Sequence, residues 1–275
     1  MSDPPAAIER TRLKASSIMA AVVADIQGQS ESAVRDGMSA RIESDSEMYK
    51  AGWYDPPPGG YAVLFAKKPF DRLKYDTLRD SRFFPRDDIQ FTEETVAQLH
   101  LCPIDRASNL FGDFGCTIYR GADEQIQTHL KQVRDLIVDV ANHAHIGMSF
   151  SELFEYSQVK FGEHQKVIAW MSTVHDTMKV NLGHTVPGSY GESISGTTLS
   201  EVKEYIQTHR VFINANQTFR IPETCAFTVE ARLTDPTLTL PNAYFHVIVR
   251  FSNGEKTVLT NFGTVFEAAG MDFML

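Results

Sequence analysis

Hydrophobic residues recur at every third or fourth position along four parts of the chain, which is the pattern of amphipathic helices. The predicted helices span residues 5–27, 30–51, 122–145 and 149–162. Asp123 and Glu124 lie in the first turn of the third helix, where the helix dipole favours negative charge. Ser149 can cap the fourth helix by accepting a hydrogen bond from a free backbone amide.

Most of the remaining regular segments read as β-strands. Residues 61–66 and 95–104 are expected strands, and the stretch SNLFGDFGCTIYRG leads through a turn into a third. After Ala169 the chain is expected to consist mostly of strands. It ends in a hairpin, YFHVIVRF, SNGE and KTVLTNF, whose Asn253-Gly254 pair suits a tight turn. The whole pattern predicts an α+β fold with a mixed sheet and long helices packed outside.

One glutamate interrupts a segment that otherwise reads as a strand. In TCAFTVEARLTD, residues 224–235, alternate residues from Cys225 to Leu233 are apolar, and Glu230 falls on the other, more polar face. Taken alone, this pattern predicts a glutamate that faces solvent. Glu230 belongs to a functional site only if other polar residues lie close to it in the folded chain.

Composition narrows the class of protein. The 275 residues, 43% of them hydrophobic, can bury a substantial core, and we expect one domain over residues 1–275. A net charge of −9 with no evident basic face disfavours nucleic acid as a partner, and the sequence shows no signal peptide or membrane span. Cys102, Cys116 and Cys225 lack the paired spacing of a zinc ribbon or disulfide framework, so a cytoplasmic setting fits best.

Four segments carry polar residues in unusual places. Asp113 lies in the apolar, glycine-containing stretch LFGDFG, where a turn aspartate is the ordinary alternative. His184 follows a glycine in VNLGHTVPG, where a lone histidine is more often structural than a ligand. Glu230 and the pair Phe245-His246 complete the set. None of the four is specific alone.

The order of these segments resembles the methionine aminopeptidase, prolidase and creatinase superfamily, whose fold is called pita-bread. NLFGDFGCTIYRG looks like the family's second-aspartate motif, NLGHTVPG like its histidine motif, and IPETCAFTVEARL like its Thr-x-Glu strand. The 122–145 helix followed by IGMSFSEL resembles a family linker, and IQGQSESAV resembles its duplicate in the first half. The resemblance implies a curved sheet and a cleft where Asp113, His184 and Glu230 meet, without the additional N-terminal domain of creatinase and prolidase.

The chain departs from the family at the positions that hold a second metal ion. Counting back eleven residues from Asp113 places Cys102 where the family's first aspartate belongs, and aligning the final hairpin places Phe245 at its bridging glutamate. A two-metal site needs carboxylates shared between the ions. The family's auxiliary histidines are also missing from the equivalent segments, around Tyr190 and over residues 64–80. A conventional two-metal peptidase is therefore not expected.

The residues that remain predict at most one ion. The resemblance implies Asp113, His184 and Glu230 as its ligands, and this set suits Fe, Mn, Co or Zn, including O₂ chemistry on non-haem iron. His100 and Cys102, two apart on one expected strand, share a face and either add a ligand or pack in the core. Without an ion, creatinase-like proton transfer through His184 stays open, with Asp113 and Glu230 sharing a proton.

Three functions stay open. The first is a small-molecule-processing enzyme of the hydrolase or lyase type, with one divalent ion or none. The second is a mononuclear metal-dependent aminopeptidase or Xaa-Pro dipeptidase, and the third is a catalytically inactive binding module. The expected catalytic residues are His184, Glu230 and Asp113. The expected substrate pocket contains Cys102, His100, Tyr190, Phe245 and His246. A small-molecule substrate is expected, with no nucleic acid or membrane partner, and a homodimer is compatible with the sequence.

Overall fold

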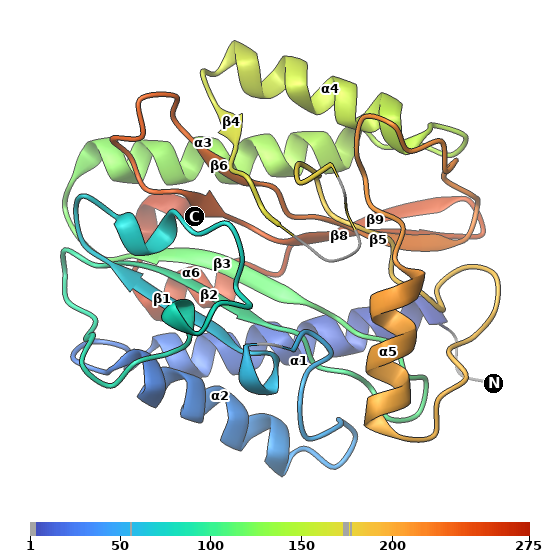
Figure 1. Cartoon of the computed structure of the whole chain (residues 1–275), viewed down its shortest axis with the longest axis horizontal. Coiled ribbons are helices and arrows are strands. Elements are labelled where there is room, and N and C mark those ends of the chain that lie inside the picture. Colours follow the sequence, from blue (N-terminus) through green and yellow to red (C-terminus); the bar gives the residue numbers. More distant parts are fainter. Residues whose placement is uncertain (1–3, 56, 173–175, 177) are drawn as a thin grey trace.

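Strands form the middle of the molecule and long helices cover them (Figure 1). The computed structural model describes residues 4–55, 57–172, 176 and 178–275. Its helices are α1 (Pro4–Val23), α2 (Glu31–Ser44), α3 (Glu124–His143), α4 (Phe150–Glu163), α5 (Leu199–His209) and α6 (Gly263–Ala269). Its strands are β1 (Ala62–Ala66), β2 (Val96–Leu101), β3 (Phe114–Tyr119), β4 (Val167–Ile168), β5 (Cys225–Val229), β6 (Arg232–Thr234), β7 (Ala243–Tyr244), β8 (Val247–Ser252) and β9 (Glu255–Leu259). The predicted α+β class is confirmed.

Three three-stranded sheets carry the fold, in the orders β1-β2-β3, β5-β8-β9 and β4-β6-β7. Each pair between these strands is antiparallel. The expectation of a mixed sheet is therefore wrong in this respect. Alternation of side chains fixes the two faces of a strand, but it does not tell in which direction the neighbouring strand runs. Helices α1 and α2 pack on the first of these sheets, and α3 packs on the second.

A short junction joins the two halves of the molecule. Cys116 of β3 forms an isolated antiparallel bridge with Phe245, and the His246 amide donates to the Gly115 carbonyl over 2.9 Å. The Tyr244 amide donates to Thr117 Oγ1 over 2.8 Å at the same place. The junction brings β3, which follows Asp113, against the segment that carries His246.

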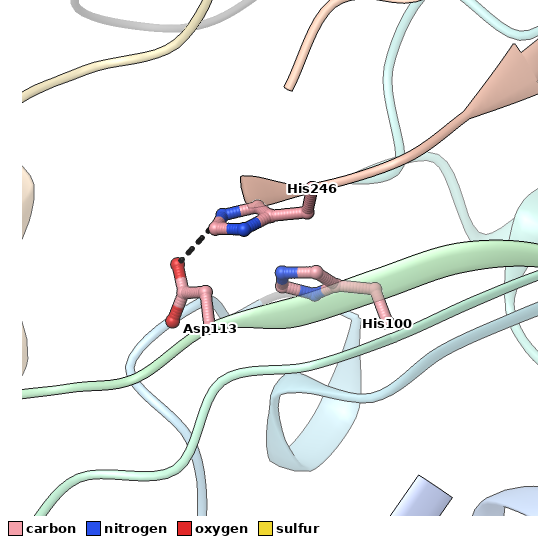
Figure 2. Close-up of side chains that lie close together, drawn as sticks. All are labelled: His100, Asp113 and His246. Carbon is pink, nitrogen blue, oxygen red and sulfur yellow. Dashed lines mark ion pairs between the residues drawn. The ribbon is translucent and has the colours of Figure 1, made fainter. Parts of the chain in front are cut away.

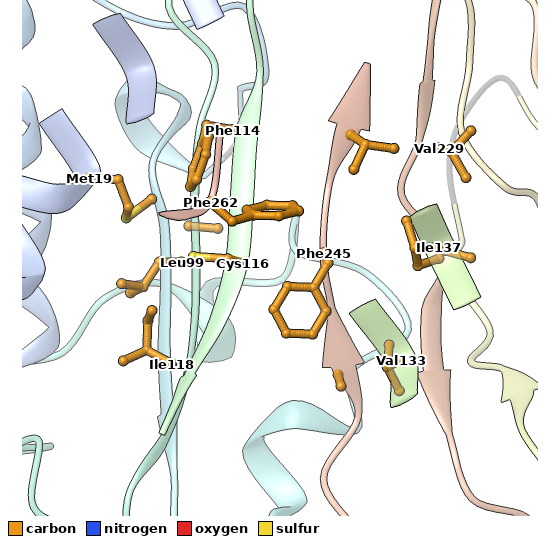
Figure 3. Close-up of a cluster of buried hydrophobic side chains, with 14 of the residues drawn as sticks. Met19, Leu99, Phe114, Cys116, Ile118, Val133, Ile137, Val229, Phe245 and Phe262 are labelled. Carbon is orange, nitrogen blue, oxygen red and sulfur yellow. The ribbon is translucent and has the colours of Figure 1, made fainter. Parts of the chain in front are cut away.

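The core continues across this junction. Figure 3 shows Phe245 and Phe262 among buried side chains that include Met19 of α1 and Ile137 of α3. Each of these four is fully or almost fully buried. A single cluster of apolar contacts therefore holds both halves and the helices outside them. Within the described residues, no helix is both long and apolar enough to span a membrane.

The helices with the clearest sequence signals form as predicted. Asp123 caps α3 by accepting hydrogen bonds from the amides of Gln125 and Ile126. Ser149 caps α4 in a capping box with Glu152. Each cap satisfies amides that the first turn of a helix leaves without an intrahelical acceptor.

Two later helices were not expected. The prediction that the chain is mostly strands after Ala169 misses α5 and α6. A signal for α5 was present, because Thr198 and Glu201 form a capping box directly before its apolar positions. The strand β2 ends at Leu101, earlier than expected, and Pro103 follows without an amide hydrogen for the ladder.

A buried ion pair anchors the start of α2. Glu31 is fully buried, and its carboxylate accepts hydrogen bonds from Arg72 over 2.7 Å and from the Phe65 amide over 2.6 Å. The Arg86 amide donates to the same carboxylate over 3.0 Å. Burial raises the pKa of Glu31, and the bonds from Arg72 and the two amides oppose that rise. Glu31 thus ties α2 to β1 and to the loop that follows it.

We predict that Glu31→Gln lowers the free energy of unfolding by about 3 kcal/mol, because it leaves the mostly buried Arg72 without a charged partner. Urea denaturation followed by circular dichroism measures the loss. Glu43→Gln, at an exposed position of the same helix, is the control and should change it by less than about 0.5 kcal/mol. Equal losses in the two variants would contradict the prediction.

A second buried group makes stability depend on pH. His129 of α3 lies with Nε2 2.9 Å from the Pro241 carbonyl, and its Nδ1 has no partner among the described residues. Burial lowers the pKa of His129 from 6.5 to about 4, and the charge of Lys166 adds to the effect. The unfolded chain therefore binds the proton first as pH falls. The stabilisation is complete above pH 6.5 and is lost between 6.5 and 4.

We expect His129→Gln, which cannot titrate, to lose less stability than the natural protein when pH falls from 7 to 4. The difference should approach roughly 3 kcal/mol, the free energy of a shift of this size. Urea denaturation at several pH values measures it. If the difference in free energy of unfolding between the two proteins did not change with pH, His129 would not be the source of the pH dependence.

Candidate functional site

A cavity of about 100 Å³ lies where the two halves of the molecule meet. Its ionisable lining residues are His100, Asp113, Lys179, His184, Arg210, Glu230 and Arg232. Its aromatic lining residues are Trp53, Tyr54, Tyr75, Phe212 and Tyr244. The cavity therefore combines apolar walls with a small set of converging polar groups, as ligand sites in proteins do.

Asp113, His184 and Glu230 all line this cavity, although they lie far apart in sequence. Asp113 directly precedes β3, His184 forms a β-bridge with Phe212, and Glu230 lies between β5 and β6. Glu230 faces the cavity and not solvent, so the expectation from strand alternation alone is wrong. Its roles as catalyst or metal ligand, like those of the other two residues, stay predictions.

The Glu230 carboxylate lies between two histidines. Its Oε1 is 3.4 Å from His184 Nε2, and its Oε2 is 3.5 Å from His246 Nε2. Thr228 Oγ1 donates to Oε1 over 2.9 Å, and the Tyr244 hydroxyl donates to Oε2 over 3.3 Å. Burial raises the pKa of Glu230 to about 7, with the Thr228 bond opposing it. A carboxyl with that pKa exchanges protons readily near neutral pH.

Asp113 is a buried carboxylate with one oxygen satisfied. Trp53 Nε1 donates to Oδ1 over 2.7 Å, while Oδ2 is buried without a hydrogen-bond partner among the described residues. Figure 2 shows Oδ2 directed at His246, whose Nε2 is 3.9 Å away. Burial raises the pKa of Asp113 well above its usual value, and the charge of Glu230 raises it further. An ionised Asp113 thus requires a cation or a proton nearby.

His100, Asp113 and His246 form a compact group (Figure 2). Each offers one ligand atom, and these atoms all lie within 4.8 Å of one another. Burial lowers the pKa of His100 to about 3 and that of His246 well below its usual value. The two rings are therefore neutral, which is the form in which histidine binds metals. Two histidines and one carboxylate are a ligand set that divalent transition metals accept.

The surroundings of His184 leave one ring nitrogen available. Its Nδ1 lies 2.9 Å from the Thr185 carbonyl, which can only accept, so Nδ1 carries the ring hydrogen. Nε2 therefore presents a lone pair to Glu230 Oε1, and two acceptors at 3.4 Å need a proton or a cation between them. Histidines that bind metals commonly donate their other ring hydrogen to a carbonyl in this way.

Arg12 reaches the site from α1 and is fully buried. Its guanidinium donates to the carbonyls of Asp113, His246 and Thr260, and its Nη1 lies 3.3 Å from His246 Nδ1. Because a guanidinium only donates, this contact favours a lone pair on Nδ1 and a hydrogen on Nε2. Burial lowers the pKa of Arg12 to about 9, so it stays charged at neutral pH.

Two expected pocket residues lie at the site. His100 lines the cavity, and His246 contacts Glu230 and Asp113 from the next segment. The expectation that Phe245 lines the pocket is wrong. Phe245 points into the core between Phe262 and Phe266, and its neighbour His246 takes the place at the site. Successive residues of an extended segment face opposite sides, so a shift of one exchanges them.

Cys102 and Tyr190, the other two expected pocket residues, also lie outside the cavity. Cys102 follows the end of β2, and its thiol donates to the Gly60 carbonyl over 3.3 Å. It does not share the environment of His100, because the strand ends between them. The Tyr190 hydroxyl pairs with Thr185, and its ring packs on Phe219.

Sequence reasoning missed several residues of the site, Arg232 of the cavity lining among them. Arg12 belongs to an amphipathic helix and Trp53 to a proline-rich loop, and neither segment carried a signal. Tyr244 lay in the predicted hairpin but was not singled out. Arg210 follows α5, and its Cζ lies 4.5 Å from the Trp53 ring centre and 5.1 Å from that of Phe212. Their positions depend on contacts that only the folded chain makes.

No family sequence model matches the chain, and no curated protein sequence does either. Solved structures do match. An X-Pro aminopeptidase from Thermotoga maritima has 12% identity and a TM-score of 0.62 over 94% of this chain and 60% of its own. A prolidase from Pyrococcus furiosus has 14% identity and a TM-score of 0.63 over 94% and 64%. A methionine aminopeptidase from Thermotoga maritima has 10% identity and a TM-score of 0.63 over 92% and 96%.

The chain spans about 60% of the length of the first two of these relatives and nearly all of the third. At identities of 10–14% the likeness concerns the fold. It agrees with the predicted resemblance over almost the whole chain. The protein therefore has the pita-bread fold of the superfamily that contains prolidase, X-Pro aminopeptidase and methionine aminopeptidase.

Proposed function

We propose that the protein is an enzyme that processes a small molecule with the help of one divalent metal ion held in the cavity. The observation that supports this most strongly is that several buried acceptors line one cavity. His184 Nε2, Glu230 Oε1 and Asp113 Oδ2 lie at the cavity with few donors among them. A cation between them offsets the cost of burying these groups.

The residues present fit such an ion. The candidate ligands are nitrogen and carboxylate oxygen atoms. Those of His100, Asp113 and His246 lie within 4.8 Å of one another, while Glu230 lies next to His246 and His184 lies next to Glu230. This donor set suits Fe, Mn, Co or Zn. A bound ion supplies Lewis-acid polarisation or an acidic water. One ion is expected, because the position aligned with the family's bridging glutamate is occupied by His246 or Phe245 and neither is a carboxylate.

The chain's own groups then orient the substrate and move protons. Glu230, with a pKa of about 7, is the group best suited to accept or donate a proton near neutral pH. Trp53 holds Asp113 through the 2.7 Å hydrogen bond to Oδ1. Tyr244 holds the second oxygen of Glu230. The apolar walls keep water away from these groups and strengthen their mutual interactions.

Catalysis without a metal is the second candidate, and the contact of Arg12 with His246 favours it. That contact places a hydrogen on His246 Nε2, which then points at Glu230 and Asp113. A hydrogen-bonded histidine between two carboxyl groups can relay a proton without an ion. The same residues carry both candidates, so metal content decides between them.

Peptide cleavage is the alternative activity on this scaffold, as an aminopeptidase or Xaa-Pro dipeptidase with a single ion. The names of the structural relatives favour it. The lack of the family's auxiliary histidines counts against it. Hydrolysis of a panel of Xaa-Pro dipeptides and N-terminal methionyl peptides tests it directly, and turnover that depends on Glu230 would make this the preferred function. An inactive binding module would bind ligand unchanged in Glu230→Gln and turn over nothing.

We predict about one equivalent of Fe, Mn, Co or Zn per chain, measured by elemental analysis after purification without chelator and after incubation with each ion. His184→Gln and His246→Gln should weaken binding by roughly 100-fold or more, since each removes a candidate ligand. His164→Gln, at an exposed position after α4, is the matched control.

Two equivalents would contradict the single-ion proposal. No binding of any of the four ions by a folded protein would leave metal-free catalysis as the preferred mechanism. Loss of metal from the control as well as from the site variants would place the ion elsewhere.

We also predict that Asp113→Asn stabilises the metal-free protein by about 1–2 kcal/mol at pH 8. Asparagine keeps an acceptor for Trp53 and removes a buried charge that Glu230 opposes. Because the pKa of Asp113 is raised in the folded state, the gain should shrink as pH falls and Asp113 itself becomes protonated.

Thermal denaturation with chelator present measures this gain. Asp123→Asn is the control, since asparagine caps a helix as well as aspartate does. A lower midpoint for Asp113→Asn than for the natural protein at pH 8 would show that the charge is already compensated without an ion.

A further inference from the structure

Positive side chains outnumber negative ones around the cavity. The carboxylates are those of Asp113 and Glu230, while the cations are Lys179, Arg210 and Arg232 in the lining and Arg12 directly behind it. Burial keeps three histidine rings neutral, those of His100 and His184 in the lining and that of His246 beside it. A divalent ion would add to the positive excess. Such a cavity favours an anionic ligand.

Among the described residues, neither Lys179, Arg210 nor Arg232 forms an ion pair. Lys179 is exposed at the edge of the cavity, with its Nζ 5.0 Å from the ring centre of the exposed Trp170, and Arg210 lies over the Trp53 ring. Arg210 Nε is buried without a hydrogen-bond partner in the part of the chain that the structure describes. Aromatic faces thus contact these cations, and the carboxylates of Glu230 and Asp113 act on Arg210 without a direct ion pair.

Arg232 is the most deeply buried of the three, with 5% of its surface exposed. Its Nη2 donates to the carbonyls of Tyr75 and Trp170, and its Cζ lies 3.7 Å from the centre of the Tyr75 ring. Its Nε and Nη1 are buried without a partner among the described residues. A fixed guanidinium with unused donors in a cavity wall is costly unless a ligand accepts from it.

The rest of the cavity limits the ligand. The aromatic walls, including Tyr54 and Phe212, and the volume of about 100 Å³ suit a small ligand with an apolar body. A free amino group on the ligand would add to the positive excess. A second anionic group on the ligand would reduce that excess further.

We infer that the cavity binds a small organic acid with two anionic groups, one paired with Arg232 and the other lying at the histidine and carboxylate centre. The inference rests on the proposed function only in that the second group would lie where the metal is held. Arg232 is a substrate-binding residue here, and its effect on metal binding should be negligible.

The test measures the binding of three probes of similar length by isothermal titration calorimetry: glutarate, glutaramide and 1,5-diaminopentane. The natural protein should bind glutarate and should bind the neutral and cationic probes at least tenfold more weakly. Arg232→Gln should weaken glutarate binding by about tenfold or more, the value of one charge-assisted hydrogen bond. Arg35→Gln, on α2 and paired with Asp36, is the control and should not change it.

Equal binding of glutarate and glutaramide by the natural protein would overturn the inference, and this comparison does not require any variant to fold. Unchanged glutarate affinity in a folded Arg232→Gln would overturn the role of Arg232. Metal content is measured on the same samples. Glutarate binding by a protein that holds no metal would refute the metal proposal alone, while metal binding without glutarate binding would refute this inference alone.

Discussion

A buried guanidinium connects the parts of the molecule that form the site. Arg12 extends from α1 and donates to the main chain at Asp113, at His246 and at Thr260. Its Cζ also lies 4.3 Å from the centre of the Phe114 ring. These contacts hold the first helix, the start of β3 and the C-terminal hairpin in one arrangement. Removing a buried cation of this kind leaves several carbonyls without donors, so the rest of the site depends on it.

The charge of Arg12 also acts on the groups around it. It lies near two carboxylates whose own burial is unfavourable, and it forms a direct ion pair with neither among the described residues. The site therefore contains separated charges in a medium of low dielectric. Such an arrangement is poor for stability and suitable for catalysis, since fixed charges can act on a substrate without first rearranging water. The cavity lies at this point, and its apolar walls maintain the low dielectric.

Departures from the family pattern have a common physical consequence. A paired-ion centre needs several shared carboxylates, and here two histidines, His100 and His246, occupy the neighbourhood of Asp113. Exchanging carboxylates for neutral imidazoles lowers the negative charge of the cavity, while the lining cations remain. The anionic ligand proposed above follows from this balance of charge. The fold is that of the solved structures that match the chain.

The sequence by itself determined the fold class, the two capped helices α3 and α4, the final hairpin and the segments that carry Asp113, His184 and Glu230. These follow from local physics, because periodicity, capping and turn residues act over a few positions. Tertiary structure alone decided that all named strands pair in antiparallel fashion. It also decided that His246 and not Phe245 faces the site, since one residue of register exchanges the faces of a strand. The places of Arg12, Trp53 and Arg232 were decided in the same way, by contacts across more than forty positions of sequence that no local pattern encodes.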